Sequence, residues 1–509
     1  MRCWLGLLLL LARVAEAALS TDPFVYDPDF NGGYVVEDRF ASVTNNTNIL
    51  GMRAAVSAAK DPSSDVIASG LVPPEYAGSP PANFGSTRYS AKGQRIPWGA
   101  PTSYAFFDNR YLDYPNASVI YISAVADVKV FEGYLFALVD IGEIGSNRDV
   151  QILSFTDGGP STNGGMFINN TPAFQTGLDE TGAALLPYCY QYYPVGLQCR
   201  LIAIAEYTTG AGRHVITMKR FFLNLNDGSL TVDNSFGISN NGAMDQAAPN
   251  ALCDAGTACS WHVHTAKALR ADTDSPTIYL AGTADASATE SDALVVAVNG
   301  HDGSLSTNFG GGTGYAVNYQ QYSSFGVGIA ASSSGDETAD VVYLAAGTSD
   351  GCGQKGIVTK LRAHVLGAGG AKTLPDYSWG NGGTRDVGGN PGSCAHVYTN
   401  VTDMILDGDN LDPDRLVLVG FENITTYPDP LFSVIRASDG ALTLFSRGGF
   451  PALHPDNTPW GGAAFQSVVA RGYGRYIVTG YLYDAAASYA TLFGTASFRS
   501  DRIFGDGFD

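Results

Sequence analysis

Short apolar runs rich in β-branched residues recur along the chain, and each ends at a glycine or another small residue. The four clearest runs end at Gly282, Gly347, Gly420 and Gly480, as in Ile-Tyr-Leu-Ala-Gly and Leu-Val-Leu-Val-Gly. Their glycines are 65, 73 and 60 residues apart. Runs of this length that stop at turn residues are typical of strands rather than helices. The pattern therefore predicts one strand in a unit of roughly 60 to 75 residues that repeats along the chain.

A second apolar run in each unit leads into an Asp-Gly pair. Asp-Gly between apolar runs predicts a β-hairpin, because glycine accepts a positive φ without steric cost. The copies are Leu294 to Val298 before Asp302, Phe432 to Ile435 before Asp439, Phe221 to Leu225 before Asp227, and Ile152 to Phe155 before Asp157.

Each unit closes with an aromatic residue near glycines, and several units open with one more apolar run. The closing aromatics are Phe236, Phe309, Trp379 and Phe445, and the opening runs are Phe325 to Ala330, Val401 to Leu406 and Phe465 to Ala470. Each unit thus has four predicted antiparallel strands. Tandem units of this kind predict an all-β fold, a single β-propeller of four-stranded blades.

The two ends of the repeat region are complementary. Residues 18–36 contain a closing module, Asp27 to Gly33, followed by an apolar strand, whereas the last unit stops one strand short. Pairing the N-terminal strand with the last unit would close the ring and remove exposed sheet edges. We therefore expect six blades in residues 118–498. Residues 37–117 are either an irregular insertion or a diverged seventh blade.

One segment has a specific resemblance. Asp302 to Gly312, with the sequence Asp-Gly-Ser-Leu-Ser-Thr-Asn-Phe-Gly-Gly-Gly, follows the strand that ends at Gly282. The combination resembles the delta-60 repeat of bacterial exported proteins, and Asp227 to Gly237 is a second, similar copy. The resemblance implies a structural repeat without a catalytic motif, so it assigns no functional residue.

The two termini favour export. Residues 1–17 are similar to a secretory signal peptide, with Arg2, a short apolar run and the small-x-small site Ala15 to Ala17. No later apolar run is long enough to span a bilayer as a helix. The tail, residues 499–509, is similar to the Ile-Phe-x-Asp-Gly-Phe-Glu/Asp ending of exported proteins in the Lysobacter and Xanthomonas group. We therefore expect a secreted, periplasmic or surface protein of a bacterium.

The cysteines fit an oxidising compartment. Six remain after the signal: Cys189, Cys199, Cys253, Cys259, Cys352 and Cys394. An even number in an exported chain predicts disulfides. Fifteen pairings are formally open. Short loops favour the first two consecutive pairs, which leaves the last two cysteines as partners.

Composition narrows the partner classes. Lys and Arg number 29 against 49 Asp and Glu, which gives a net charge of −20. Binding to nucleic acid requires clustered basic residues, so we expect no nucleic-acid partner. The 61 glycines, about 12% of the chain against an average near 7%, are explained by the repeated strand ends and turns. We expect a monomer with a protein, glycan or small-molecule partner.

Candidate chemistry gathers in segments that lead into the opening strands. We expect Trp261, His262, His264, His396, His454 and Trp460 to converge near the mouth of the central channel. Aromatic and polar side chains in a concave site suit a sugar or another small ligand. His262 and His264 lie on one face of a predicted strand and would form half of a metal site.

Other chemistry has little support in the sequence. Asp407, Asp409 and Asp412 are spaced unlike a calcium loop, and a solvated hairpin explains them better. No hydrolase elbow, zinc-protease motif or nucleotide-binding loop occurs, and no motif requires a cofactor. We therefore expect a non-enzymatic binding propeller. A hydrolase or metal-dependent oxidoreductase at the channel mouth, and a structural envelope component, remain the alternatives.

Overall fold

The structure is a computed structural model of the 509-residue chain. It describes residues 27, 29–31, 36–38, 50–56, 65–72, 83–94, 105–107, 120–143, 147–156, 167–174, 176–237, 242–248, 259–285, 291–318, 324–333, 340–349, 354–362, 375–387, 398–408, 413–423, 428–447, 462–471, 474–484 and 490–499. All regular elements in these residues are β-strands apart from a 3₁₀ turn at Asn31. The prediction of an all-β protein is therefore confirmed.

The strands form six sheets. Sheet 1 contains β2 (Leu50–Val56), β3 (Val66–Val72), β4 (Asn83–Tyr89) and β5 (Ala105–Phe107). Sheet 2 contains β6 (Ile120–Phe131), β7 (Tyr134–Glu143), β8 (Asp149–Thr156) and β9 (Phe167–Phe174). Sheet 3 contains β10 (Asp179–Tyr192), β11 (Gly196–Thr208), β12 (His214–Leu223), β13 (Leu230–Val232) and β14 (Ala243–Gln246).

The remaining sheets come from the second half of the chain. Sheet 4 contains β15 (Ser260–Leu269), β16 (Thr277–Asp285), β17 (Ser291–Asn299) and β18 (Tyr315–Asn318). Sheet 5 contains β19 (Ser324–Ser332), β20 (Val341–Ser349), β21 (Gln354–Arg362), β22 (Thr384–Val387), β23 (Tyr398–Gly408), β24 (Pro413–Asn423), β25 (Pro428–Arg436) and β26 (Leu442–Arg447). Sheet 6 contains β27 (Gly462–Ala470), β28 (Arg475–Asp484), β29 (Ala490–Arg499) and β1 (Val36–Asp38).

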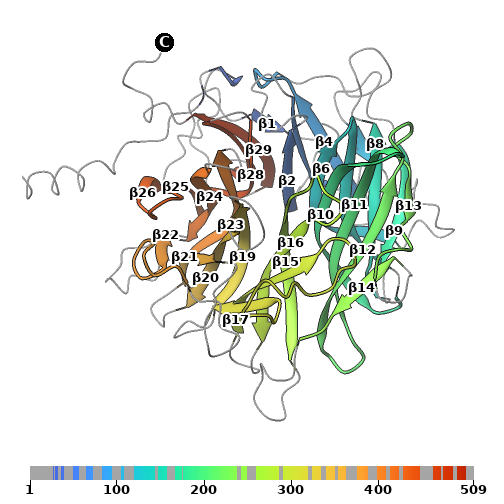
Figure 1. The fold of residues 1–509 in the computed structure, drawn as a ribbon. Coiled ribbons are helices and arrows are strands. Elements are labelled where there is room, and N and C mark those ends of the chain that lie inside the picture. The colour runs from blue at the N-terminus through green and yellow to red at the C-terminus, as the bar shows by residue number, and fades with distance from the viewer. Residues whose placement is uncertain are drawn as a thin grey trace, which may run out of the picture.

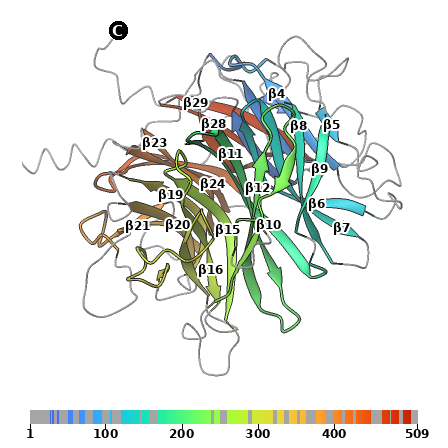
Figure 2. The same ribbon diagram turned by 45° about the vertical axis from the view of Figure 1, so that its right-hand side comes forward.

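The sheets follow one another around a ring. The opening strands contact each other in the order β2, β6, β10, β15, β19, β23 and β27, and β27 contacts β2. Figures 1 and 2 show the sheets arranged in chain order from blue to red, with the first and last sheets side by side. This is a β-propeller-like arrangement.

The predicted count of six or seven blades is wrong, because the described residues form four separate four-stranded blades. Four sheets are discrete and four-stranded, sheet 3 has a fifth strand, and sheet 5 has eight strands. Two groups of four strands, β19 to β22 and β23 to β26, are joined in this sheet by one parallel residue pair, Gln354 with Tyr398. The amide of the Gln354 side chain also donates to Asn400 Oδ1 at 2.9 Å, which reinforces this junction. Residues 37–117, predicted as an insertion or a diverged blade, contain sheet 1.

The predicted closure by the N-terminal segment is present. β1 pairs with β29, with Val36 opposite Thr495 and Asp38 opposite Phe493. Upstream of this pairing, the backbone N–H of Asp27 donates to the carbonyl of Ser497 at 3.0 Å. The last sheet is therefore completed by the beginning of the chain.

Two of the repeated glycines, Gly282 and Gly420, lie inside their strands and each faces a backbone carbonyl of the opening strand. A Cβ on Gly282 would lie 1.8 Å from the carbonyl oxygen of His262, and one on Gly420 would lie 1.8 Å from that of Asn400. In each case the carbonyl belongs to the residue just before a bulge in the opening strand. Only glycine leaves room for this approach of two backbones, which explains the glycine at these two positions inside β16 and β24.

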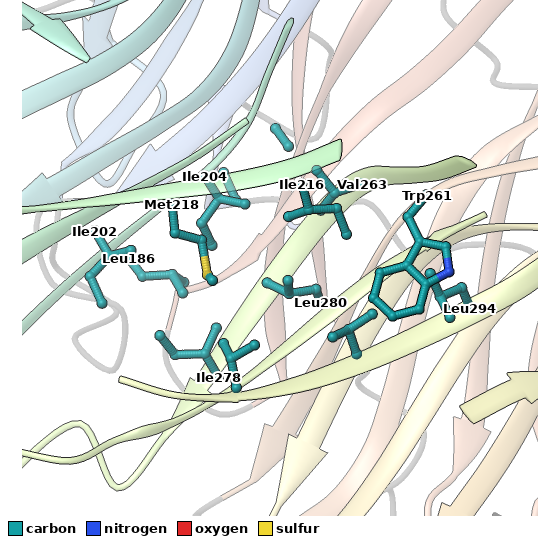
Figure 3. Close-up of a cluster of buried hydrophobic side chains, with 14 of the residues drawn as sticks. Leu186, Ile202, Ile204, Ile216, Met218, Trp261, Val263, Ile278, Leu280 and Leu294 are labelled. Carbon is teal, nitrogen blue, oxygen red and sulfur yellow. The ribbon is translucent and has the colours of Figure 1, made fainter. Parts of the chain in front are cut away.

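Apolar side chains fill the spaces between neighbouring sheets. One cluster joins sheets 3 and 4 and includes Ile204, Met218, Trp261 and Leu280. Figure 3 shows these side chains converging between the strands, with the indole of Trp261 at one end of the cluster. Burial of this kind, repeated from sheet to sheet, holds the ring together.

One predicted disulfide is confirmed. Cys189 and Cys199 are bonded across β10 and β11, where they face each other in register. Cys259 is also disulfide-bonded. Cys253, Cys352 and Cys394 lie outside the described residues, as do residues 1–26 with the predicted signal and residues 500–509 of the tail. The described residues include no helix that could cross a membrane.

Candidate functional site

Four ionisable side chains meet where sheets 3 and 4 adjoin. Glu206 stands near the end of β11 and His214 at the start of β12, so the two lie diagonally across one hairpin. His262 stands near the start of β15, and Asp285 ends the neighbouring strand β16. All four side chains are partly exposed at this edge of the ring. We call these residues the His–carboxylate cluster.

The imidazole of His262 lies between two carboxylates. Its Nδ1 is 3.2 Å from Glu206 Oε1, and its Nε2 is 3.0 Å from Asp285 Oδ2. The hydrogen bonds with Asp285 and Glu206 raise the pKa of His262 to about 9, although partial burial works against this rise. In the metal-free protein the ring is therefore an imidazolium at neutral pH.

The pKa values of the two carboxylates beside His262 are lowered. Burial would raise the pKa of Glu206, but the hydrogen bond and the charge of His262 hold that pKa below its ordinary value. The pKa of Asp285 is also lowered against the effect of burial, by hydrogen bonds from His262 and Ser291. Both carboxylates are thus ionised at neutral pH.

His214 completes the cluster from the other side of Glu206. Its Nδ1 lies 3.4 Å from Glu206 Oε1, and its ring centroid lies 4.1 Å from that of His262. The backbone N–H of His214 donates to Ser260 Oγ at 3.1 Å, which fixes the start of β12 against β15. The hydroxyl of Thr208 lies 3.5 Å from the same Nδ1.

Glu206 also has a structural contact. Its second oxygen, Oε2, accepts the backbone N–H of Val263 at 3.0 Å. Asp140 at the corresponding place in sheet 2 accepts the N–H of Gly182 in sheet 3 at 2.7 Å. In both cases a carboxylate late in a second strand satisfies a free N–H on the opening strand of the next sheet.

The structure separates the predicted site residues. His262 belongs to the His–carboxylate cluster, whereas Nε2 of His264 lies 3.3 Å from the hydroxyl of Thr283 and is not among the three grouped ligand atoms. Trp261 is fully buried in the cluster of Figure 3 and packs edge-on against Tyr315, so its place is in the core. The other predicted residues, His396, His454 and Trp460, lie outside the described residues.

Sequence reasoning missed Glu206, His214 and Asp285. One signal was present: Glu206 and His214 flank a Gly-rich turn at a spacing that places them diagonally on one face of a hairpin. No sequence pattern reports contacts between different sheets, so the approach of His262 to this pair was not predictable.

Of the three carboxylates weighed above as a calcium site, the described residues include only Asp407, and its contacts are with neighbouring protein groups. Asp407 is buried and accepts hydrogen bonds from the hydroxyl of Tyr476 at 2.6 Å and the backbone N–H of Gly474 at 3.1 Å. Asp409 and Asp412 lie outside the described residues. Asp407 therefore joins two sheets.

A second surface feature is the tip of the hairpin formed by β10 and β11. Tyr192, Tyr193, Val195 and Leu197 are 51%, 91%, 65% and 50% exposed. Phe222 of β12 and Leu225 in the turn after it are exposed as well, so six of the eight exposed large hydrophobic residues in the described chain lie in sheet 3 or the turns between its strands. We call Tyr192 to Leu197 the hairpin tip.

Comparisons with known proteins give weak alignments to solved structures but no family. No protein-family model matches the chain, and no curated protein matches it. A neuraminidase-like protein of A/little yellow-shouldered bat/Guatemala/060/2010 aligns at 9% identity over 92% of this chain and 97% of its own, with a TM-score of 0.33.

Two further alignments are of the same kind. The Nup133 β-propeller domain of Vanderwaltozyma polyspora aligns at 9% identity over 84% of this chain and 91% of its own, with a TM-score of 0.34. The fucose-specific lectin from Aleuria aurantia aligns at 10% identity over 80% and 99%, with a TM-score of 0.31. Alignments at this level assign no function to the chain.

Proposed function

We propose that this protein is an exported, non-enzymatic interaction module. In this proposal the propeller is a rigid body that presents the hairpin tip to an apolar surface on a partner protein. The observation that carries the proposal is the concentration of exposed apolar side chains at one place. Soluble monomers rarely expose contiguous apolar patches without an interaction function.

The hairpin tip lies at the end of the longest strands in the described residues. β10 has 14 residues and β11 has 13, whereas the paired strands of sheet 4 have 9 or 10. Tyr193 is the most exposed of the large hydrophobic residues described, at 91%. Such a side chain is available to a partner without rearrangement of the fold.

The hairpin is held in one conformation near its tip. The disulfide of Cys189 with Cys199 links the two strands just below the tip. Next to it, the Arg200 guanidinium stacks 3.8 Å from the ring centroid of Phe222 and donates to Asp233 Oδ2 at 2.9 Å. A tip that is already ordered loses little conformational entropy when it binds.

The uncharged, aromatic composition of the tip favours an apolar surface on the partner. No charged residue occurs from Gly182 to Cys199, although the whole chain has a net charge of −20. Tyrosine supplies large contact area together with a hydroxyl that can hydrogen-bond at the edge of an interface. An uncharged protein surface therefore fits the tip better than a polyanion or an anionic membrane.

Export is supported by the cysteines and by the sequence of the first 17 residues. Disulfides persist in oxidising compartments such as the periplasm or the cell exterior. Both Cys189 and Cys199 are bonded, and so is Cys259. A bacterial source and a place among the delta-60 repeat proteins remain proposals that rest on the sequence motifs.

Photo-crosslinking in the source organism tests the proposal. A photoreactive phenylalanine replaces Tyr193 in the full chain, and a matched variant has it at Tyr377, which lies outside sheet 3 and is 63% exposed. We expect one discrete adduct with another protein from position 193, none from position 377, and loss of the adduct when Leu197→Asp is added.

Three results would overturn this function. These are an equal adduct from position 377, no adduct from position 193, and an adduct that persists in Leu197→Asp. An adduct that contains only a second copy of the chain would replace partner binding with self-association. The structural-component alternative predicts adducts from both positions, because a packed envelope component has neighbours on every side.

A further inference from the structure

The His–carboxylate cluster has the geometry of a metal-ligand set. One ligand atom each from Glu206, His214 and His262 lies within 4.8 Å of the others. Glu206 Oε1 is 3.2 Å from Nδ1 of His262 and 3.4 Å from Nδ1 of His214. Neighbouring ligand atoms around a tetrahedral zinc ion with bonds of 2.0–2.1 Å are about 3.3–3.4 Å apart. Both distances therefore fit edges of such a tetrahedron.

Asp285 stands where an orienting carboxylate stands in a metal site. Its Oδ2 lies 3.0 Å from Nε2 of His262, on the side of the ring away from Glu206. Its other oxygen, Oδ1, accepts a hydrogen bond from the Ser291 hydroxyl at 2.8 Å. A carboxylate at Nε2 fixes the ring and leaves the lone pair on Nδ1, as carboxylate–histidine–metal arrangements require.

Sheet packing does not account for the two histidines. The backbone contact of Glu206 uses Oε2 alone, and Asp140 makes the same kind of contact without an imidazole bonded to it in the described structure. Burial leaves the pKa of Asp140 raised to about 7. The two imidazoles are thus additional to the contact between a carboxylate and a backbone N–H, which forms between sheets 2 and 3 without them.

We infer that Glu206, His214 and His262 bind one divalent first-row transition-metal ion, with Asp285 orienting His262. Two nitrogen donors and one carboxylate oxygen suit zinc and its neighbours, whereas calcium and magnesium prefer oxygen alone. Three protein ligands leave one coordination position for water or another small ligand. Because the side chains are partly exposed, an ion can reach them from solvent.

Calorimetric titration of the full chain with zinc chloride after chelator treatment tests this site. We expect one zinc ion per chain in the wild type and at least a 100-fold loss of affinity in His214→Ala and in His262→Ala. Asp285→Asn keeps the ligands and should weaken binding 10- to 100-fold. The matched control is His301→Ala, because His301 Nδ1 also lies near a carboxylate, 3.2 Å from Asp274, but outside the cluster.

A spectroscopic readout separates loss of binding from loss of fold. Cobalt(II) in a tetrahedral site with nitrogen and oxygen ligands absorbs visible light, and this band should appear in the wild type and in His301→Ala but not in His214→Ala. Thermal melts without metal show whether each variant folds. Equal zinc affinity in the wild type and in His214→Ala would overturn the inference. The absence of zinc binding to the wild type would also overturn it. Calcium chloride should produce no binding heat, and a calcium complex that competes with zinc would also contradict it.

Discussion

Asp27 and Arg471 form a buried ion pair between opposite ends of the chain, with Asp27 Oδ2 3.7 Å from Arg471 Nη2. Both side chains are almost completely excluded from solvent. The same arrangement recurs within the chain, where Asp233 pairs with Arg200 and Arg220 at 2.9 and 3.0 Å. The N-terminal segment therefore occupies the place in the last sheet that an internal segment occupies in sheet 3.

The turn that follows each aspartate strengthens this equivalence. The N–H of Phe30 donates to the carbonyl of Asp27 at 3.0 Å, and the N–H of Phe236 donates to that of Asp233 at 3.1 Å. An arginine lies over each aromatic ring, Arg471 over Phe30 and Arg220 over Phe236. The N-terminal segment thus closes the ring through the same kinds of contact that the turn at Asp233 makes in sheet 3.

Removing Asp27 should open the ring. Because Arg471 would keep its buried charge without its partner, we expect Asp27→Ala to lower the free energy of unfolding by about 3–5 kcal/mol. Urea denaturation measures this change. Asp29→Ala is the control, since Asp29 is exposed and pairs with Arg475 at 3.3 Å, and an exposed pair contributes at most about 1 kcal/mol. Equal losses in the two variants would contradict the assigned role of Asp27.

The sequence predicted the repeating strands and the closure because both depend on local pattern. The runs that end at Gly282, Gly420 and Gly480 lie in β16, β24 and β28, the second strands of their units. The N-terminal strand was predicted because the first module had no beginning and the last unit had no end. These are properties of strand order, and strand order can be read from the sequence.

Other parts of the structure depend on contacts without a local pattern. Sheet 1 was ambiguous because its strands contain many small and polar residues, as in Asn83–Tyr89. The join within sheet 5 rests on one residue pair, Gln354 with Tyr398. In the His–carboxylate cluster only His262 was predicted, because Glu206 and His214 come from a different sheet and Asp285 comes from the next strand without a motif that marks it.

Alanine in place of Gly420, which lies inside β24, should be strongly destabilising. A Cβ at position 420 would overlap the carbonyl oxygen of Asn400 at 1.8 Å, so one of the two backbones must move. We expect Gly420→Ala to lower the free energy of unfolding by about 3 kcal/mol or more. Gly210→Ala is the matched control, since no atom lies within 4 Å of a Cβ built there. A neutral Gly420→Ala would show that the two strands are farther apart than described.

Asp140 should make stability depend on pH. Burial raises its pKa in the folded protein to about 7, above the ordinary value of 3.8 for an aspartate. The folded state therefore holds the proton more tightly, and stability increases as pH falls from above 7 toward 4. By linkage this contribution is about 4 kcal/mol across that range. Asp140→Asn keeps an oxygen that can accept the N–H of Gly182 but cannot titrate.

Chemical denaturation at several pH values between 4 and 8.5 measures the Asp140 contribution. We expect the difference in unfolding free energy between wild type and Asp140→Asn to grow as pH rises through 7. A difference that does not change with pH would contradict the raised pKa of Asp140.

The disulfide below the hairpin tip should stabilise the fold and the tip together. Replacing Cys189 and Cys199 by serine should lower the free energy of unfolding by about 2–3 kcal/mol, the contribution expected for a short closed loop. Proteolysis between residues 192 and 197 should become faster in this variant, while cleavage elsewhere stays the same. Unchanged proteolysis would show that the strand pairing alone orders the tip.

The most direct measurement of the central claim compares crosslinking from position 193 in three backgrounds: the wild type, Leu197→Asp, and the double variant His214→Ala, His262→Ala. The hairpin tip and the His–carboxylate cluster are assigned separate roles. We therefore predict that the partner adduct is lost in Leu197→Asp and retained in the double histidine variant when thermal melts show both to be folded. Retention of the adduct in Leu197→Asp, with its loss in the histidine variant, would contradict the account and place partner binding at the cluster.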